Sequence, residues 1–182
     1  MKVNKINVFI TTLLLAFSSL VTFASSTAGN TIDDSVITAK VKSKLLADKM
    51  VSGLDIKVET NNGIVTLQGI VKTDSEATTA VELASSTPGV IDVDTSKLTI
   101  ESSNQPLADS LITAKVKGVY VREKLFGDKS VNVTQIHVET KDGVVYLTGK
   151  ANSATQAKNA EELAKSVKGV KDVKSSVTVE QL

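Results

Sequence analysis

Apolar residues follow two different periods along the chain, and each period predicts a different element. Residues 36–45 carry apolar side chains three and four positions apart, directly after the acidic pair Asp33-Asp34. This spacing is typical of an amphipathic helix, and either aspartate can accept hydrogen bonds from the free amides of its first turn. Residues 56–59 instead alternate apolar and charged side chains. They predict a strand with one buried face.

Turn and capping residues divide the next forty positions into three further elements. Asn61-Asn62-Gly63 is typical of a tight hairpin turn, so we expect a return strand over 64–69. Thr73 and Asp74 precede Glu76 in the manner of a capping box, which opens a helix that Pro88-Gly89 ends. A last strand follows over 93–100. The order is helix, strand, strand, helix, strand, and the third strand can lie beside either member of the hairpin.

The second half of the chain repeats this plan. The six residues from Ile37 recur letter for letter from Ile112, at an offset of 75, whereas the three residues from Val58 recur from Val138, at an offset of 80. The second copy therefore has five extra residues, which we place within 117–124, where its first helix is lengthened or bulged. We predict an α+β protein of two tandem modules, each with two helices packed on one face of a three-stranded sheet.

The copies occupy residues 33–101 and 107–180, and the polar, proline-containing segment 102–106 reads as the linker between them. Residues 1–24 are typical of a signal peptide, with two lysines, then an apolar run, then small side chains. We expect cleavage after Ala24, the alternative being an uncleaved membrane anchor. The chain has no cysteine, which rules out disulfides and a lipoprotein's acylated cysteine. The prediction is an exported, periplasmic protein that is not a lipoprotein.

A strand framed by two glycines occurs once in each copy, as Gly63-Ile64-Val65-Thr66-Leu67-Gln68-Gly69 and as Gly143-Val144-Val145-Tyr146-Leu147-Thr148-Gly149. An alanine-rich helix and then Gly89-Val90 or Gly169-Val170 follow it. This pattern resembles the BON domain family over nearly all of the chain after the predicted signal peptide. The resemblance implies a periplasmic protein of envelope or osmotic stress whose domains bind phospholipid surfaces, and it implies neither an enzyme nor a cofactor.

The glycines of the motif have a local steric interpretation. Gly63 and Gly143 permit the tight turn, and Gly69 and Gly149 let the chain leave the strand without a side-chain clash. We therefore assign structural roles to the motif glycines Gly63, Gly69, Gly89, Gly143, Gly149 and Gly169.

Residues suited to catalysis or metal binding are scarce. His137 is the single histidine, it falls on the solvent side of its predicted strand, and no cysteine exists to complete a metal site with it. No calcium loop, phosphate-binding glycine loop or Gly-x-Ser-x-Gly motif is present. We predict no catalytic residue, metal or cofactor, and the near-neutral charge gives no indication of nucleic acid binding.

The two copies differ most in charge. Residues 33–101 hold 7 basic and 11 acidic side chains, a net charge of −4, while residues 107–180 hold 12 and 9, a net charge of +3. Lysines gather on the second helix of the second copy and on the segment after it: Lys158, Lys165, Lys168, Lys171 and Lys174. One hypothesis is that they approach anionic phospholipid headgroups. The alternative is a solvated helix face with lysines favoured near its C-terminus.

Apolar and aromatic residues also concentrate in the second copy, in and around its extra residues. The candidates for lipid or partner binding are Val119, Tyr120, Arg122 and Phe126. They either fill a contact between the modules, with Gly118 kinking the helix toward the first copy, or form an exposed patch.

The sequence thus predicts a non-enzymatic periplasmic protein that binds phospholipid surfaces mainly through its second module. Two alternatives remain open: a chaperone-like protein that holds unfolded envelope clients, and an adaptor for peptidoglycan or an envelope protein. The oligomeric state is left open.

Overall fold

The computed structural model of the protein describes residues 32–51, 55–102, 107–129, 131 and 135–179. The predicted signal peptide at 1–24 lies outside the described residues, as does most of the predicted linker, residues 103–106. Among the residues that are described, no helix has the length and apolar character needed to cross a membrane.

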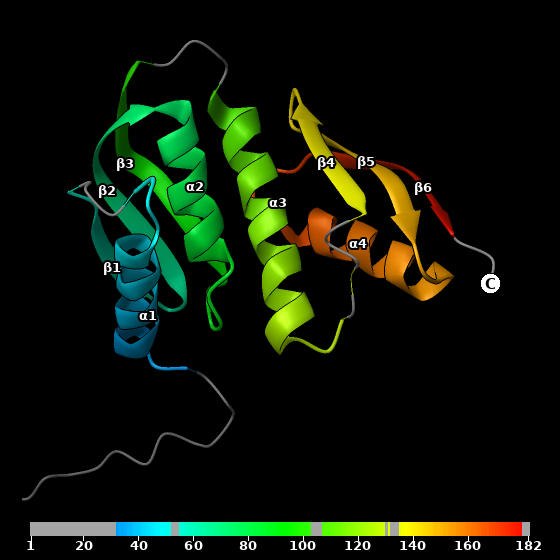
Figure 1. Ribbon diagram of the computed structural model, residues 1–182, viewed down its shortest axis with the longest axis horizontal. Helices are drawn as coiled ribbons and strands as arrows, with labels where there is room; N and C mark the ends of the chain where they lie inside the picture. Colours follow the sequence, from blue (N-terminus) through cyan, green and yellow to red (C-terminus); the bar gives the residue numbers. More distant parts are fainter. Residues whose placement is uncertain (1–31, 52–54, 103–106, 130, 132–134, 180–182) are drawn as a thin grey trace, which may run out of the picture. The chain divides into compact units, whose positions relative to one another are not determined.

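The helices and strands follow the predicted order in both copies (Figure 1). The first module consists of α1 (Asp34–Ala47), β1 (Lys57–Asn61), β2 (Ile64–Thr73), α2 (Asp74–Ser85) and β3 (Asp92–Ser102). The second consists of α3 (Leu107–Phe126), β4 (Ile136–Lys141), β5 (Val144–Ala151), α4 (Ala154–Ser166) and β6 (Asp172–Val179). The α+β class and the tandem modules are confirmed.

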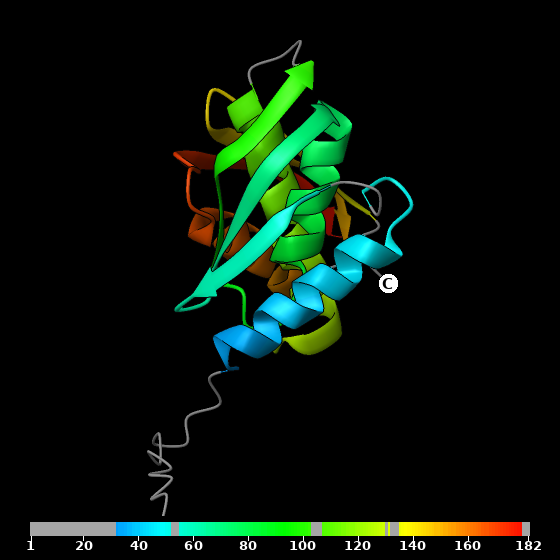
Figure 2. The same cartoon turned by 90° about the vertical axis from the view of Figure 1, so that its left-hand side faces the viewer.

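Each sheet has the second strand of its module at the centre. β2 pairs with β1 in antiparallel and with β3 in parallel orientation, and β5 does the same with β4 and β6. Figure 2 shows the first sheet in this order. The strand order that the sequence left open is therefore settled, with the third strand beside the return strand of the hairpin. On β2, Val65 and Leu67 are buried in the core while Ile64 and Ile70 are exposed on the opposite face, as a strand with one buried face requires.

A carboxylate on the first turn of a helix holds each hairpin turn. Asn62 and Asp142 adopt positive φ angles of 50° and 53° ahead of their glycines, as the predicted tight turns need. The Asp34 carboxylate of α1 accepts hydrogen bonds from the Asn62 and Gly63 amides, at 2.7 and 2.9 Å. The Asp109 carboxylate of α3 accepts from Asp142 and Gly143, at 2.6 and 2.8 Å. Each first helix is thus pinned to its hairpin.

A pair of threonines repeats the same connection one turn along each helix. The Thr38 hydroxyl donates to the Thr60 hydroxyl at 2.7 Å, and Thr113 donates to Thr140 at 2.8 Å. Polar residues of the repeated sequence therefore join the first helix to the first strand. The residues that recur in both copies therefore include polar residues that make equivalent hydrogen bonds, as well as the apolar residues of the cores.

The six motif glycines all have positive φ: Gly63, Gly69, Gly89, Gly143, Gly149 and Gly169. The reason given above for Gly69 and Gly149 is wrong, because β2 continues to Thr73 and β5 to Ala151. A Cβ on Gly69 would collide with the Asp55 carbonyl oxygen, and a Cβ on Gly149 with that of Gln135. The chain entering the first strand passes too close to these positions for any side chain.

The extra length of the second copy begins near the end of α3. α3 has 20 residues against 14 in α1, and Val116 and Tyr120 fill the second core as Val41 and Leu45 fill the first, still at an offset of 75. The helix stays in register through Tyr120, and the offset is 80 again at Val131, which is buried like Val51. The five extra residues therefore lie between Tyr120 and Val131, so the first helix is lengthened as expected and the predicted segment 117–124 is correct only in its last part.

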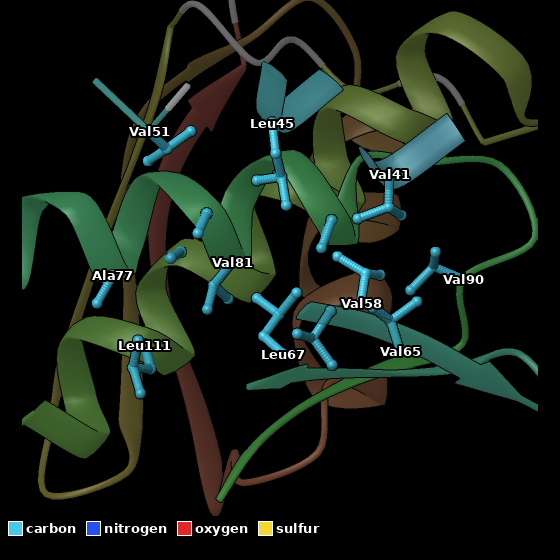
Figure 3. Packing of buried hydrophobic residues seen from close by; sticks show 14 of the residues in the cluster. Val41, Leu45, Val51, Val58, Val65, Leu67, Ala77, Val81, Val90 and Leu111 are labelled. Carbon is cyan, nitrogen blue, oxygen red and sulfur yellow. The ribbon is translucent and has the colours of Figure 1, made fainter. Parts of the chain in front are cut away.

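α3 also contributes to the core of the first module. Leu111 and Ala114 belong to the first hydrophobic cluster, where Figure 3 shows Leu111, whereas Val116 and Tyr120 belong to the second. Gly118 lies inside α3, which is assigned as one helix over Leu107–Phe126. It marks a close approach to α2, because a Cβ there would lie 2.5 Å from the Ser85 Cβ and 2.7 Å from the Glu82 carbonyl oxygen.

We predict that replacing Asp109 with Asn destabilises the protein by about 1–3 kcal/mol, since a neutral amide accepts the two turn amides less strongly than a carboxylate. Urea unfolding measures the change. Asp142→Asn is the control and should be near neutral, because the first hairpin has an asparagine, Asn62, at the same turn position. Equal effects of the two substitutions would contradict the role given to the Asp109 carboxylate.

We predict that Gly118→Ala destabilises the protein by about 1–3 kcal/mol through overpacking against α2. The sign of the change in stability distinguishes two effects, because helix propensity alone would favour alanine over glycine by about 1 kcal/mol at an exposed position inside a helix. Lys124→Ala, at an exposed position of α3, controls for helix propensity. A thermal melt in which Gly118→Ala raises the midpoint would contradict the close approach.

Candidate interaction surfaces

The sequence candidates on α3 divide into buried and exposed residues. Val119 and Tyr120 retain only 7% and 2% of their surface, whereas Leu125 and Phe126 retain 61% and 63%. The first two therefore lack the surface to contact lipid or a partner, and this part of the hypothesis is corrected. The exposed pair lies beyond the part of α3 that packs on either core.

Tyr120 is fixed in place by its hydroxyl as well as by its ring. The hydroxyl donates to the Ala160 carbonyl oxygen of α4 at 2.7 Å. Burial raises the pKa of the Tyr120 phenol, with a smaller contribution from Glu161, so the group stays protonated at neutral pH. It is a structural hydrogen-bond donor between α3 and α4.

Arg122 connects α3 to the first module. Its guanidinium donates to the Ser85 carbonyl oxygen at 3.4 Å and to the Val90 carbonyl oxygen. Nearby, Lys115 forms an ion pair of 2.9 Å with Asp92 at the start of β3. Arg122 therefore takes part in the contact between the modules, and the remaining exposed candidate of the four is Phe126.

The five candidate lysines are all exposed, but they do not form one patch. Lys158 and Lys165 are on α4, which ends at Ser166. Lys168 lies 3.8 Å from Asp92 of the first module, and the Lys171 ammonium donates to the Asp142 carbonyl oxygen in the hairpin at 3.0 Å. Lys174 stands over the Tyr146 ring, 5.6 Å from its centre. Their three-residue spacing resembles a helix face, yet the last three positions belong to a turn and a strand.

Basic side chains do lie near the exposed end of α3. Lys129 forms an ion pair of 2.8 Å with Glu162 of α4, which also lies 3.7 Å from Lys158. Lys124 is exposed on the last turn of α3. We call Lys124, Leu125, Phe126, Lys129 and Lys158 the α3 end. It combines two apolar side chains with three lysines, beside the carboxylates of Glu162 and of the exposed Asp128.

A groove runs along β4 and was missed by the sequence interpretation. It consists of two adjoining hollows of about 350 and 290 Å³ that share Glu82 of α2, Lys117 of α3, and His137 and Val138 of β4. The predicted solvent position of His137 is confirmed, since its side chain is exposed. The described residues contain no group of three or more His, Cys, Asp or Glu side chains arranged to hold a metal.

Comparison with known proteins assigns the family. The BON domain model matches residues 33–102 and 108–181. The chain is 38% identical to the osmotically-inducible protein Y of Escherichia coli, over 82% of this chain and 74% of that protein. It is 34% identical to a 21 kDa hemolysin of Actinobacillus pleuropneumoniae (80% and 74% covered) and 32% identical to the outer membrane lipoprotein DolP of Haemophilus influenzae (81% and 75% covered). Two family matches on the two observed modules show that the chain belongs to the BON-domain family.

Proposed function

We propose that this protein is a non-enzymatic component of the bacterial envelope, located in the periplasm, that binds phospholipid surfaces through the α3 end of its second BON domain. Its relatives support the envelope assignment, because one is named an outer membrane lipoprotein and another is named for osmotic induction.

The exposure of Leu125 and Phe126 is the observation that carries the proposal. Exposure of two adjacent large apolar side chains to water is unfavourable. Transfer of each side chain from water into the lipid acyl chains contributes about 1.5–3 kcal/mol when the side chain is fully buried there. Leu125 and Phe126 do not belong to the second core, in which Tyr120 is the last buried residue of α3.

The cations of the α3 end support an anionic surface as the target. Each lysine near such a surface contributes about 1 kcal/mol, and the contribution falls within a Debye length. Lys124 directly precedes Leu125, Lys129 follows Phe126 by three residues, and Lys158 shares the Glu162 carboxylate with Lys129. Lys168 instead lies near Asp92 of β3, and Lys171 donates to the hairpin. We therefore assign the first three lysines to the membrane because they lie near the apolar pair.

We predict that Phe126→Ser weakens binding to phosphatidylglycerol vesicles by about tenfold, as expected when most of one large apolar contact is lost. Vesicle cosedimentation of the full chain measures it. The matched control is Leu46→Ser, because Leu46 is 70% exposed near the end of α1, the corresponding helix of the first domain. Equal losses in the two variants would contradict the assignment to α3.

We predict that replacing Lys124 and Lys158 with Gln weakens the same binding by about tenfold or more at low salt, and by less at high salt. The paired control replaces Lys168 and Lys171 with Gln and removes the same charge. If both double variants weaken binding equally, net charge rather than the α3 end determines it. Equal binding of the unmodified protein to phosphatidylcholine vesicles would also contradict the electrostatic part.

A further inference from the structure

The groove beside β4 opens onto the edge of that strand rather than onto one of its faces. It is lined by consecutive residues of β4: Ile136, His137, Val138, Glu139 and Thr140. Side chains of successive strand residues point to opposite faces of a sheet. A hollow that reaches all of them therefore runs along the strand's backbone, and β4 is an edge strand of its sheet.

The hydrogen-bond register identifies the backbone groups that face this groove. The Lys150 amide donates to the Gln135 carbonyl oxygen at 3.1 Å, so Gln135 points its backbone groups toward β5. Backbone groups alternate in direction along an antiparallel strand. His137 and Glu139 therefore also face β5, while the N–H and C=O groups of Ile136, Val138 and Thr140 face the groove.

The opposite wall limits what can pair with this edge. It is formed by α2 and α3, with Thr78 and Glu82 from the first and Ser110 and Lys117 from the second. The helices restrict the space beside β4 to the two adjoining hollows of about 350 and 290 Å³. A single extended chain that entered these hollows could form hydrogen bonds with the backbone groups at the exposed edge of the strand.

Glu82 gives the groove a preferred charge. Burial raises the pKa of the Glu82 carboxyl, against a smaller opposing effect of Lys117. Among the residues that the structure describes, none donates a hydrogen bond to this carboxylate. A cation brought into the groove would offset the unfavourable burial of its charge.

We infer that the groove is a docking site for an extended peptide segment that pairs as an added strand with the free edge of β4 and places a basic side chain against Glu82. This surface is separate from the α3 end and does not depend on lipid binding. It gives the protein a second kind of partner, a polypeptide in extended conformation.

The probe is a fluorescent seven-residue peptide in which threonine and valine alternate about a central lysine, titrated into the full chain and followed by fluorescence anisotropy. A second peptide carries the same side chains with methyl groups on the four backbone nitrogens that flank the lysine. We expect the methylated peptide to bind at least about tenfold more weakly, because it cannot donate to the strand. Equal affinities of the two peptides would overturn strand pairing.

Amide hydrogen exchange of the complex locates the peptide. Binding should slow exchange at the amides of Ile136, Val138 and Thr140 and leave His137 and Glu139 unchanged. The edge of β1, which has the same Val-Glu-Thr sequence, provides an internal comparison and should be unaffected. If the peptide does not slow exchange at the three outward-facing amides of β4, the proposed binding site is wrong.

Substitution of Glu82 tests the charge preference. Glu82→Gln should weaken binding of the lysine peptide by about fivefold and should have no such effect on a peptide with a central glutamine. Glu59→Gln on β1 is the control that removes the same charge elsewhere. An unchanged affinity of the lysine peptide for the Glu82→Gln variant would overturn the role of this carboxylate.

Discussion

The packing of α3 against α2 is the interaction on which the arrangement of the described chain depends. α3 supplies Leu111 and Ala114 to the first core and Val116 and Tyr120 to the second, so one helix is shared by two hydrophobic clusters. Each module alone is small, and a small domain buries a limited fraction of its apolar surface. Sharing a helix enlarges both cores without a disulfide. The close approach at Gly118 brings α3 against α2, and the Lys115–Asp92 ion pair joins α3 to the start of β3.

The surfaces available for binding follow from this packing. Because α3 stays in register with α1 as far as Tyr120, its additional residues extend beyond the core and leave Leu125 and Phe126 exposed. Because α3 also rests on α2, the two helices form a wall opposite the edge of β4. The end of α1 also exposes an apolar side chain, Leu46, directly after the buried Leu45. The two modules therefore differ in the length of the first helix and in the neighbours that their contact gives to α3.

Local signals in the sequence were sufficient to predict the elements, because hairpin turns, caps and apolar periods are determined by near neighbours along the chain. The turns at Gly63 and Gly143 and the cap at Thr73 are examples. Features that depend on residues distant along the chain were not predictable in this way. Gly118 was expected to kink α3, Tyr120 was placed either in a contact between the modules or in an exposed patch, and Lys168 was a candidate for lipid binding. The structure places Ser85, Ala160 and Asp92 beside them. The groove along β4 was missed for the same reason.

Native-state hydrogen exchange of the Leu111→Ala variant tests the shared helix most directly. Leu111 belongs to the second module by sequence and to the first core by packing. Removing its side chain should lower the protection of the β2 amides of Val65 and Leu67, by an amount consistent with about 2–5 kcal/mol for a leucine truncated in a core. Loss of protection confined to α3 and the second sheet, with β2 unchanged, would show that the modules fold independently and that α3 is not shared between the two cores.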